Sequence, residues 1–264
     1  MLVRASHVYI LYKPELVGDE YEHCFRSFPE CRVIRETNFH MDFLQLFEEI
    51  KTRYVLFGID DLVYFRGVSL ETIQSTFDTM GELLFGFSLR LDQQQMPEDF
   101  AAGSVRPESI AGQTIYVLDW TKGQTSSTWY PFELCATIYR TQDIRRLFSR
   151  IVSRNRAANR YLRPGSQAAR IYGRFFKTRN LYKRFGFFYN PNTLESWCCR
   201  YVQRHPDEFG HVLAYQAICG TAIQVNMVNT TTINVWDDSA KLTVEVLAEK
   251  YRQGWRLEIG RAHV

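Results

Sequence analysis

The sequence predicts an α/β fold with a mostly parallel central sheet flanked by helices. Over the first 140 residues, short apolar runs alternate with amphipathic helical patterns, as is typical of layered α/β proteins. The links between them are short, and the order β-α-β-α-β-α-β favours parallel strands. With 264 residues, 45% of them hydrophobic and 15% aromatic, the chain can bury a substantial core, and we expect one domain over residues 1–264.

Six apolar runs are expected to form strands, because they are rich in β-branched and aromatic residues. They are HVYILYK (7–13), CRVIRE (31–36), YVLFGI (54–59), LLFGFSLRL (83–91), QTIYVLDW (113–120) and LCATIYR (134–140). We expect a short helix around Tyr21, one capped by Asn38 that runs to Ile50, and one capped by Ser69 that ends near Met80. Two later helices are expected, at 195–203 and 243–251.

The charge is distributed unevenly. The chain has 32 basic and 29 acidic residues, a net charge of +3, but 13 of the basic residues lie between 145 and 184, a stretch without Asp or Glu. The rest of the protein therefore carries −10. Apolar residues at helical spacing alternate with arginines here, so we expect residues 141–187 to form a basic amphipathic helical insertion.

Three interpretations of this basic insertion remain open. An amphipathic helix with arginines beside aromatic residues suits the anionic surface of a membrane, which is the interpretation we favour. A solvated helical hairpin whose arginines pair with the acidic body, or a self-association surface, comes next. Nucleic-acid binding through phosphate contacts and stacking comes last, and we expect no nucleic-acid partner.

Cysteine spacing and hydropathy point to the cytoplasm. The six cysteines show no CxxC spacing, so we expect reduced thiols and no zinc site. The sequence shows no secretory signal and no apolar run near the roughly 20 residues that cross a bilayer. We expect a cytoplasmic protein whose membrane contact, if it has one, is peripheral, at the inner face of the cell membrane.

The most distinctive local feature is a pair of carboxylates, Asp60 and Asp61, at the end of the expected strand 54–59. Ligands of open α/β sheets bind beyond the carboxyl ends of strands, and paired Asp there can hold a hard divalent cation. The alternative is that both residues belong to an ordinary turn or helix cap.

Five segments, taken in order, resemble landmarks of bacterial GT-A glycosyltransferases related to glycosyltransferase family 2. They are YVLFGIDDLVYFR (54–66), FSLRL (87–91), WYPFELCATIYR (129–140), FFYNPNTLE (187–195) and a closing stretch with IQVNMVNTT (223–231) and LAEKYRQGWRLEI (247–259). The resemblance covers most of the chain from about His7 onward, except the basic insertion. It implies a GT-A-like fold and a metal-dependent, inverting glycosyltransferase.

The resemblance also implies roles for single residues. Asp60 and Asp61 would hold Mn²⁺ or Mg²⁺ beside the diphosphate of a nucleotide-sugar, and Glu195 would be the general base toward a glycan or lipid-linked acceptor. The bland alternative for Glu195 is stabilisation of the helix dipole. Arg66 and Arg90 could contact phosphate by fork geometry, or they could pair with the acidic body.

Three departures from the family pattern support an alternative function. Leu62 stands where the family often has a third acidic residue, and Cys135 and Ala136 stand where it often has Asp-Gly. We expect the family's first strand and loop, which help to hold the nucleotide base, to be missing before His7, either because the chain starts late or because it is a shortened version. The alternative is a non-catalytic glycosyltransferase-like protein that binds a membrane surface or a partner protein through its basic insertion.

Overall fold

The structure is a computed structural model that describes residues 7–13, 18–59, 62–93, 104–122, 130–153, 190–222 and 252–254, together with residues 167, 171, 188, 249 and 250. Two compact units are distinguished. One comprises residues 1–4 and 38–222, and the other comprises residues 5–37 and 223–264. Some expectations concern segments outside the described residues. These segments are most of 154–187, all of 223–248 and most of the helix expected at 243–251.

The smaller unit contains the first expected strand pair. Strand β1 (Val8–Tyr12) pairs in parallel with β2 (Cys31–Arg35), and helix α1 (Gly18–Phe25) connects them. The Tyr12 ring packs edge-on against Phe25, with ring centroids 4.9 Å apart. Both expected strands are present and parallel, but they form a two-stranded sheet of their own and do not belong to the central sheet in which they were expected.

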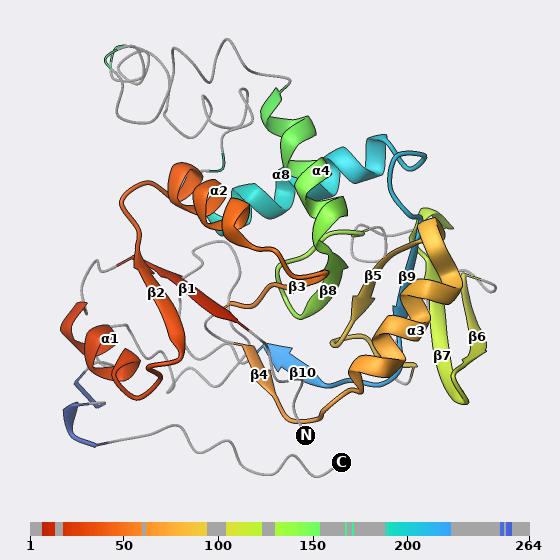
Figure 1. Ribbon diagram of the computed structural model, residues 1–264, viewed down its shortest axis with the longest axis horizontal. Helices are drawn as coiled ribbons and strands as arrows, with labels where there is room; N and C mark the ends of the chain where they lie inside the picture. Colours follow the sequence, from red (N-terminus) through yellow and green to blue (C-terminus); the bar gives the residue numbers. More distant parts are fainter. Residues whose placement is uncertain are drawn as a thin grey trace, which may run out of the picture. The chain divides into compact units, whose positions relative to one another are not determined.

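The larger unit is built on a six-stranded mixed sheet (Figure 1). Its spatial order is β3 (Tyr54–Leu56), β8 (Thr137–Arg140), β5 (Leu84–Ser88), β9 (Val212–Tyr215), β7 (Gln113–Asp119) and β6 (Val105–Ile110). A separate antiparallel pair joins β4 (Leu62–Tyr64) to β10 (Gly220–Ala222).

The prediction of a mostly parallel sheet is wrong for this six-stranded sheet. Its central pair, β5 and β9, is parallel, whereas the other four neighbouring pairs are antiparallel. Strand β8 lies between β3 and β5, antiparallel to both, and a hairpin forms the far edge. The order of apolar runs in a sequence does not show that β8 lies between β3 and β5, because pairing between distant strands is decided by packing.

The edge strand β6 was not expected, and it contains Pro107. Proline cannot donate a hydrogen bond to a neighbouring strand, so it is tolerated at the edge of a sheet. A two-residue turn joins β6 to β7, in which Ala111 and Gly112 both have positive φ angles, of 50° and 72°. This is the geometry of hairpin turns that match the twist of the strands.

Helices pack on both faces of the sheet. Among the described residues of this unit, the α-helices with printed bounds are α2 (Phe39–Glu49), α3 (Leu70–Met80), α4 (Thr141–Ser153) and α8 (Pro191–Arg204). Ile138 joins a core cluster with Phe77 of α3, while its neighbour Tyr139 packs on the opposite face against Phe85 and Phe132. Figure 1 shows α2, α4 and α8 lying together, apart from α3.

The expected helix caps are confirmed. The Asn38 side chain accepts a 3.1 Å hydrogen bond from the backbone N–H of Met41 at the start of α2, and Ser69 caps α3. Helix α8 begins four residues before the expected position, because Asn190 caps it and Pro191 occupies its first turn.

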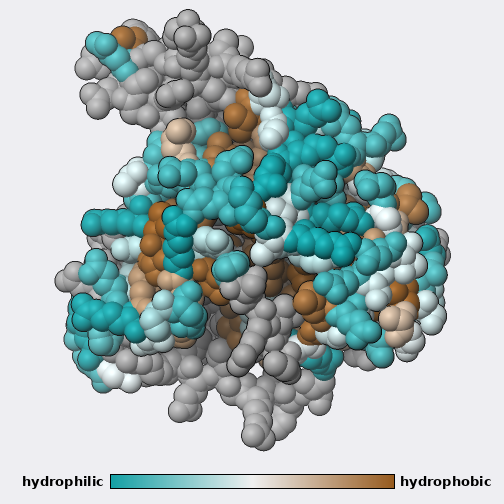
Figure 2. All heavy atoms as spheres, in the orientation of Figure 1, coloured by the Kyte–Doolittle hydropathy of each residue, from teal (hydrophilic) through white to brown (hydrophobic). Residues whose placement is uncertain are grey.

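The first part of the expected basic insertion, residues 141–153, is helix α4. Its apolar side is buried, with Ile144 and Leu147 fully enclosed. Its arginines contact the same unit: Arg146 lies 3.1 Å from Asp143 and over the Phe209 ring, and Arg150 lies 3.3 Å from Glu208. Figure 2 shows mostly hydrophilic residues over α4 and α8 on the face in view. Glu208 and Phe209 lie outside the expected insertion, whereas Asp143 belongs to α4 itself, and the three interpretations of the whole insertion stay predictions.

Two further findings concern the cysteines and the membrane. All six cysteines are free thiols, and Cys198 and Cys199 are buried in α8. Within the described part of the chain, none of the helices has both the length and the apolar character that crossing a membrane requires.

Candidate functional site

An ion pair between a half-exposed arginine and a largely buried glutamate lies where β5 ends. Arg90 follows β5, and its guanidinium donates to Oε2 of Glu133, whose side chain is only 12% exposed. The hydroxyl of Thr137 donates to Oε1 of the same carboxylate at 2.5 Å. Both oxygens of Glu133 are therefore occupied by donors from the neighbouring strands.

The backbone of Glu133 is also held in place. Its N–H donates to the hydroxyl of Tyr139 at 2.9 Å, and that hydroxyl lies 3.2 Å from the Glu133 carbonyl. Tyr139 is fully buried in β8. The segment that presents Glu133 is thus attached to the core of the sheet.

Glu195, the predicted general base, joins this arrangement from helix α8. Its Oε1 accepts a 2.6 Å hydrogen bond from the hydroxyl of Tyr130, and its Oε2 accepts a 3.1 Å hydrogen bond from the backbone N–H of Leu134. These contacts place the Glu195 carboxylate beside the segment that carries Glu133. The helix-dipole alternative fits poorly, because Glu195 lies beyond the first turn of α8, where the dipole effect fades.

The electrostatics of the cluster follow from burial and from two nearby carboxylates. Burial raises the pKa of Glu133, the Arg90 charge opposes that rise, and the negative charge of Glu195 adds to it. Burial together with the hydrogen bond to Glu195 raises the pKa of Tyr130. The pKa of Tyr64 is raised to about 12 by burial and by the nearby Cys135 and Glu133. These tyrosines are therefore neutral hydrogen-bond donors at physiological pH.

Asp60 and Asp61, the predicted metal ligands, lie outside the described residues. The chain before them is described: the carbonyl of Phe57 accepts a 3.2 Å hydrogen bond from the N–H of Ala136. Leu62, directly after them, begins β4 and packs against the hydrophobic core. No group of three or more His, Cys, Asp or Glu that could hold a metal ion occurs among the described residues.

The turn at Cys135 and Ala136 lies at one of the departures from the GT-A pattern. Ala136 has a φ angle of 66°, in the left-handed region that favours glycine. Its carbonyl accepts a 2.9 Å hydrogen bond from the N–H of Leu89, which holds the turn against the end of β5. The position where the family often has glycine thus keeps a glycine-like conformation here, although alanine occupies it.

Arg66 has a different setting from Arg90. Its backbone N–H donates to the carbonyl of Cys219 at 3.2 Å, and the N–H of Cys219 donates in turn to the carbonyl of Leu89 at 2.7 Å. Within the described ranges, the side chain of Arg66 forms no hydrogen bond with Glu133 or Glu195. The structure therefore brings together Arg90 and Glu195 but leaves Arg66 outside the cluster.

Sequence patterns alone do not identify Glu133 and Tyr130 as site residues. Both lie in WYPFELCATIYR, a run that was used only as a landmark. An acidic residue between Phe132 and Leu134, both buried, was the available signal, because a buried carboxylate needs a partner. The partner, Arg90, is 43 residues away and could not be assigned from spacing.

Comparison with known proteins gives one informative match. Over 158 residues, 55% of this chain, the sequence is 26% identical to the bifunctional glycosyltransferase pgtA of Dictyostelium discoideum, and the match covers 20% of that protein. This chain thus spans about a fifth of the length of that relative. No family model matches the sequence. No solved structure matches it either. The comparison supports a distant relation to a glycosyltransferase over about half of the chain.

Proposed function

We propose that this chain is a glycosyltransferase domain that transfers a sugar from a nucleotide-sugar to a glycan or lipid-linked acceptor. The observation that carries the proposal is the cluster in which Glu195, Tyr130, Glu133 and Arg90 meet at the end of β5. Its support from outside the structure is the distant match to pgtA. The resemblance of five ordered segments to GT-A glycosyltransferases supports it further.

In this proposal, Glu195 is the general base. The acceptor hydroxyl attacks the anomeric carbon and forms the new glycosidic bond, while the bond from that carbon to the diphosphate oxygen breaks. The proton of the hydroxyl passes to Glu195, and the nucleoside diphosphate leaves with the bonding electrons. A single displacement of this kind inverts the anomeric configuration. Tyr130 is a positioning residue, because it contacts the Glu195 carboxylate and fixes its direction.

Arg90 is suited to contact the diphosphate. A guanidinium carries five N–H donors, its side chain is 43% exposed, and Glu133 holds it from one side. Arg66, which is exposed, is the weaker candidate for that contact. Both remain proposals.

Asp60 and Asp61 would hold Mn²⁺ or Mg²⁺, since adjacent carboxylates supply the oxygen ligands that these hard cations prefer. When bound, the cation would neutralise charge on the diphosphate leaving group. Leu62 packs in the core, so it offers no ligand and the segment supplies two carboxylates. Peripheral contact of the basic segment with a membrane also remains a proposal.

Donor hydrolysis and sugar transfer test the proposal directly. The protein is incubated with UDP-, GDP- and dTDP-sugars and either Mn²⁺ or Mg²⁺, and released nucleoside diphosphate is measured. We expect release with at least one donor, its loss in Asp61→Asn, and a reduction of at least about 100-fold in Glu195→Gln. Glu48→Gln, an exposed glutamate on α2, is the matched control and should keep full activity.

A second measurement separates the enzyme from the non-catalytic alternative. A nucleoside diphosphate that binds the folded protein with Mn²⁺ must raise its Tm. Absence of any shift with every nucleotide, together with binding to anionic vesicles, would favour the binding protein and contradict the proposed activity.

A further inference from the structure

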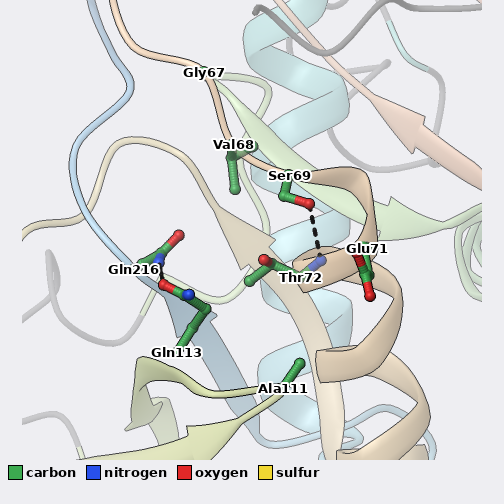
Figure 3. A pocket seen from close by; sticks show the side chains of 8 residues that line it. All are labelled: Gly67, Val68, Ser69, Glu71, Thr72, Ala111, Gln113 and Gln216. Atoms are coloured by element: carbon green, nitrogen blue, oxygen red, sulfur yellow. Dashed lines mark hydrogen bonds between the residues drawn. The ribbon is translucent and has the colours of Figure 1, made fainter.

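A cavity in the larger unit lies beside the start of helix α3. It has a volume of about 320 Å³, at the small end of the range of about 300–1,000 Å³ found for ligand sites. Its lining comes from the segment before α3, the first turn of α3, the β6–β7 turn and the residue that follows β9 (Figure 3). None of the residues assigned to the proposed reaction lines it.

Thr72 is a polar residue that lines this cavity. The residue is only 6% exposed, and Figure 3 shows its side chain directed toward Gln113 and Gln216. Its hydrogen bonds in the described part of the chain involve the backbone: its N–H donates to Ser69 Oγ and its carbonyl accepts from Thr76. No described residue donates to or accepts from the Thr72 hydroxyl. The Thr72 residue is buried but lines the cavity, so its hydroxyl is available to a ligand there.

More hydrogen-bonding groups surround the same space. The side-chain amide of Gln216 donates to Oε1 of Gln113 at 3.1 Å, which fixes the two amides on the wall opposite α3. The Ser69 cap engages the N–H of Thr72, so the N–H groups of the two preceding helical residues lack an acceptor within the helix. The cavity therefore offers a hydroxyl group on one wall and side-chain amides on the opposite wall.

The charges of the lining restrict the ligand class. Among the described residues that line the cavity there is no Lys, Arg or His, and Glu71 is acidic, which disfavours an anion. One carboxylate is too few for a divalent cation. An apolar ligand would leave the Thr72 hydroxyl, and the amide groups of Gln113 and Gln216 that do not take part in their mutual hydrogen bond, without partners at a cost in free energy. Val68 and Ala111 add small apolar surfaces. What remains is a neutral ligand with several hydroxyl groups and an apolar C–H face.

We propose that this cavity binds a neutral saccharide, with the Thr72 hydroxyl and the Gln113–Gln216 amide pair hydrogen-bonding to the hydroxyl groups of the sugar. The proposal rests on the cavity alone, so it holds whether or not the chain proves to be a transferase.

Saturation-transfer NMR on the full chain, without nucleotide or metal, tests the proposal. The probes are lactose, maltose, cellobiose and di-N-acetylchitobiose, with inorganic phosphate as a separate titration followed by protein chemical shifts. We expect transfer to at least one disaccharide, with a Kd on the order of millimolar, and no specific phosphate binding. Transfer to none of the four sugars, or binding of phosphate at this cavity, would overturn the proposal.

Variants locate the binding. Thr72→Val keeps the shape of the side chain and removes the hydroxyl, and Gln216→Ala removes an amide, so each should weaken the disaccharide about three- to tenfold. Thr79→Val, an exposed residue on the same helix, is the matched control and should leave the Kd unchanged. If Thr72→Val and Gln216→Ala both bind the disaccharide as tightly as the wild type does, the assignment of the sugar to this cavity is wrong. Glu195→Gln should keep sugar binding, which separates this result from failure of the proposed activity.

Discussion

The hydroxyl of Tyr130 lies 2.6 Å from Oε1 of Glu195 and donates a hydrogen bond to it, although the two residues are 65 positions apart. This bond ties the loop before β8 to helix α8. The Glu195 carboxylate is held from its other side by the N–H of Leu134. Its orientation is therefore set by a neighbouring segment and not by α8 alone.

Removing the Tyr130 hydroxyl should impair turnover more than donor binding. In Tyr130→Phe we expect kcat to fall about 10- to 100-fold with little change in donor KM, because the carboxylate loses its fixed direction. Combining it with Glu195→Gln should cost little beyond Glu195→Gln alone, since both changes act on one carboxylate. Steady-state kinetics of the two single variants and the double variant measure this. Tyr116→Phe is the control, and additive losses would contradict the coupling.

The Arg90–Glu133 pair should respond unequally to loss of each partner. Arg90→Ala leaves a buried carboxylate without its cation, and we expect it to lower the free energy of unfolding by about 1–3 kcal/mol, less than for fully buried pairs because Arg90 is half exposed. Glu133→Gln should cost less, since the Arg90 guanidinium can turn toward water. Urea denaturation measures both, and a double variant should be more stable than Arg90→Ala. If Glu133→Gln lowers the free energy of unfolding more than Arg90→Ala does, the argument is wrong, because the unpaired Arg90 would then be more costly than the unpaired Glu133.

His40 should make stability depend on pH. It is 4% exposed, its Nδ1 accepts a hydrogen bond from the N–H of Phe188, and burial lowers its pKa from 6.5 to about 4. The unfolded chain therefore takes up a proton at a higher pH than the folded protein does. This titration leaves the free energy of unfolding unchanged above about pH 6.5, and lowers it by up to about 3 kcal/mol as the pH falls from 6.5 to 4.

Asparagine at position 40 can accept the same hydrogen bond but cannot titrate in this range. Urea denaturation of the wild type and His40→Asn between pH 7.5 and about 4 should therefore give curves that converge as the pH falls. Carboxylates titrate similarly in both proteins, so the difference isolates His40. Parallel curves would mean that His40 does not carry this dependence.

Substitution by glycine should change the stability of the protein differently at two alanines that have left-handed conformations. Ala111→Gly relieves the strain of a positive φ in an exposed turn, and we expect a gain of about 1 kcal/mol and a higher Tm. Ala136→Gly relieves similar strain but removes a fully buried methyl group, which offsets about 0.8 kcal/mol, so its effect should be small. Thermal unfolding of both variants decides this. A lower Tm for Ala111→Gly would contradict the strain argument.

Local signals in the sequence predicted the elements better than their pairing. Asn38 and Ser69 cap helices as expected, because a cap depends on residues within one turn. The antiparallel position of β8 depends on packing across the sheet, which periodicity does not record. The Glu195 position came from a resemblance, whereas its partner Tyr130 required coordinates, since the hydrogen bond joins a loop and a distant helix. The predicted pair at 60 and 61 stays a prediction.

The parallel pairing of β5 with β9 has a consequence for the chain while the ribosome is still making it. It divides the sheet into two three-stranded halves, and Leu84 of one pairs with Val212 of the other, a residue translated long afterwards. Strand β5 and the β6–β7 hairpin leave the ribosome well before β9, so each keeps an unpaired edge while the intervening segment is still being made. Such edges invite pairing with other chains. The nascent protein should therefore be most prone to aggregation in the interval before Tyr215 emerges.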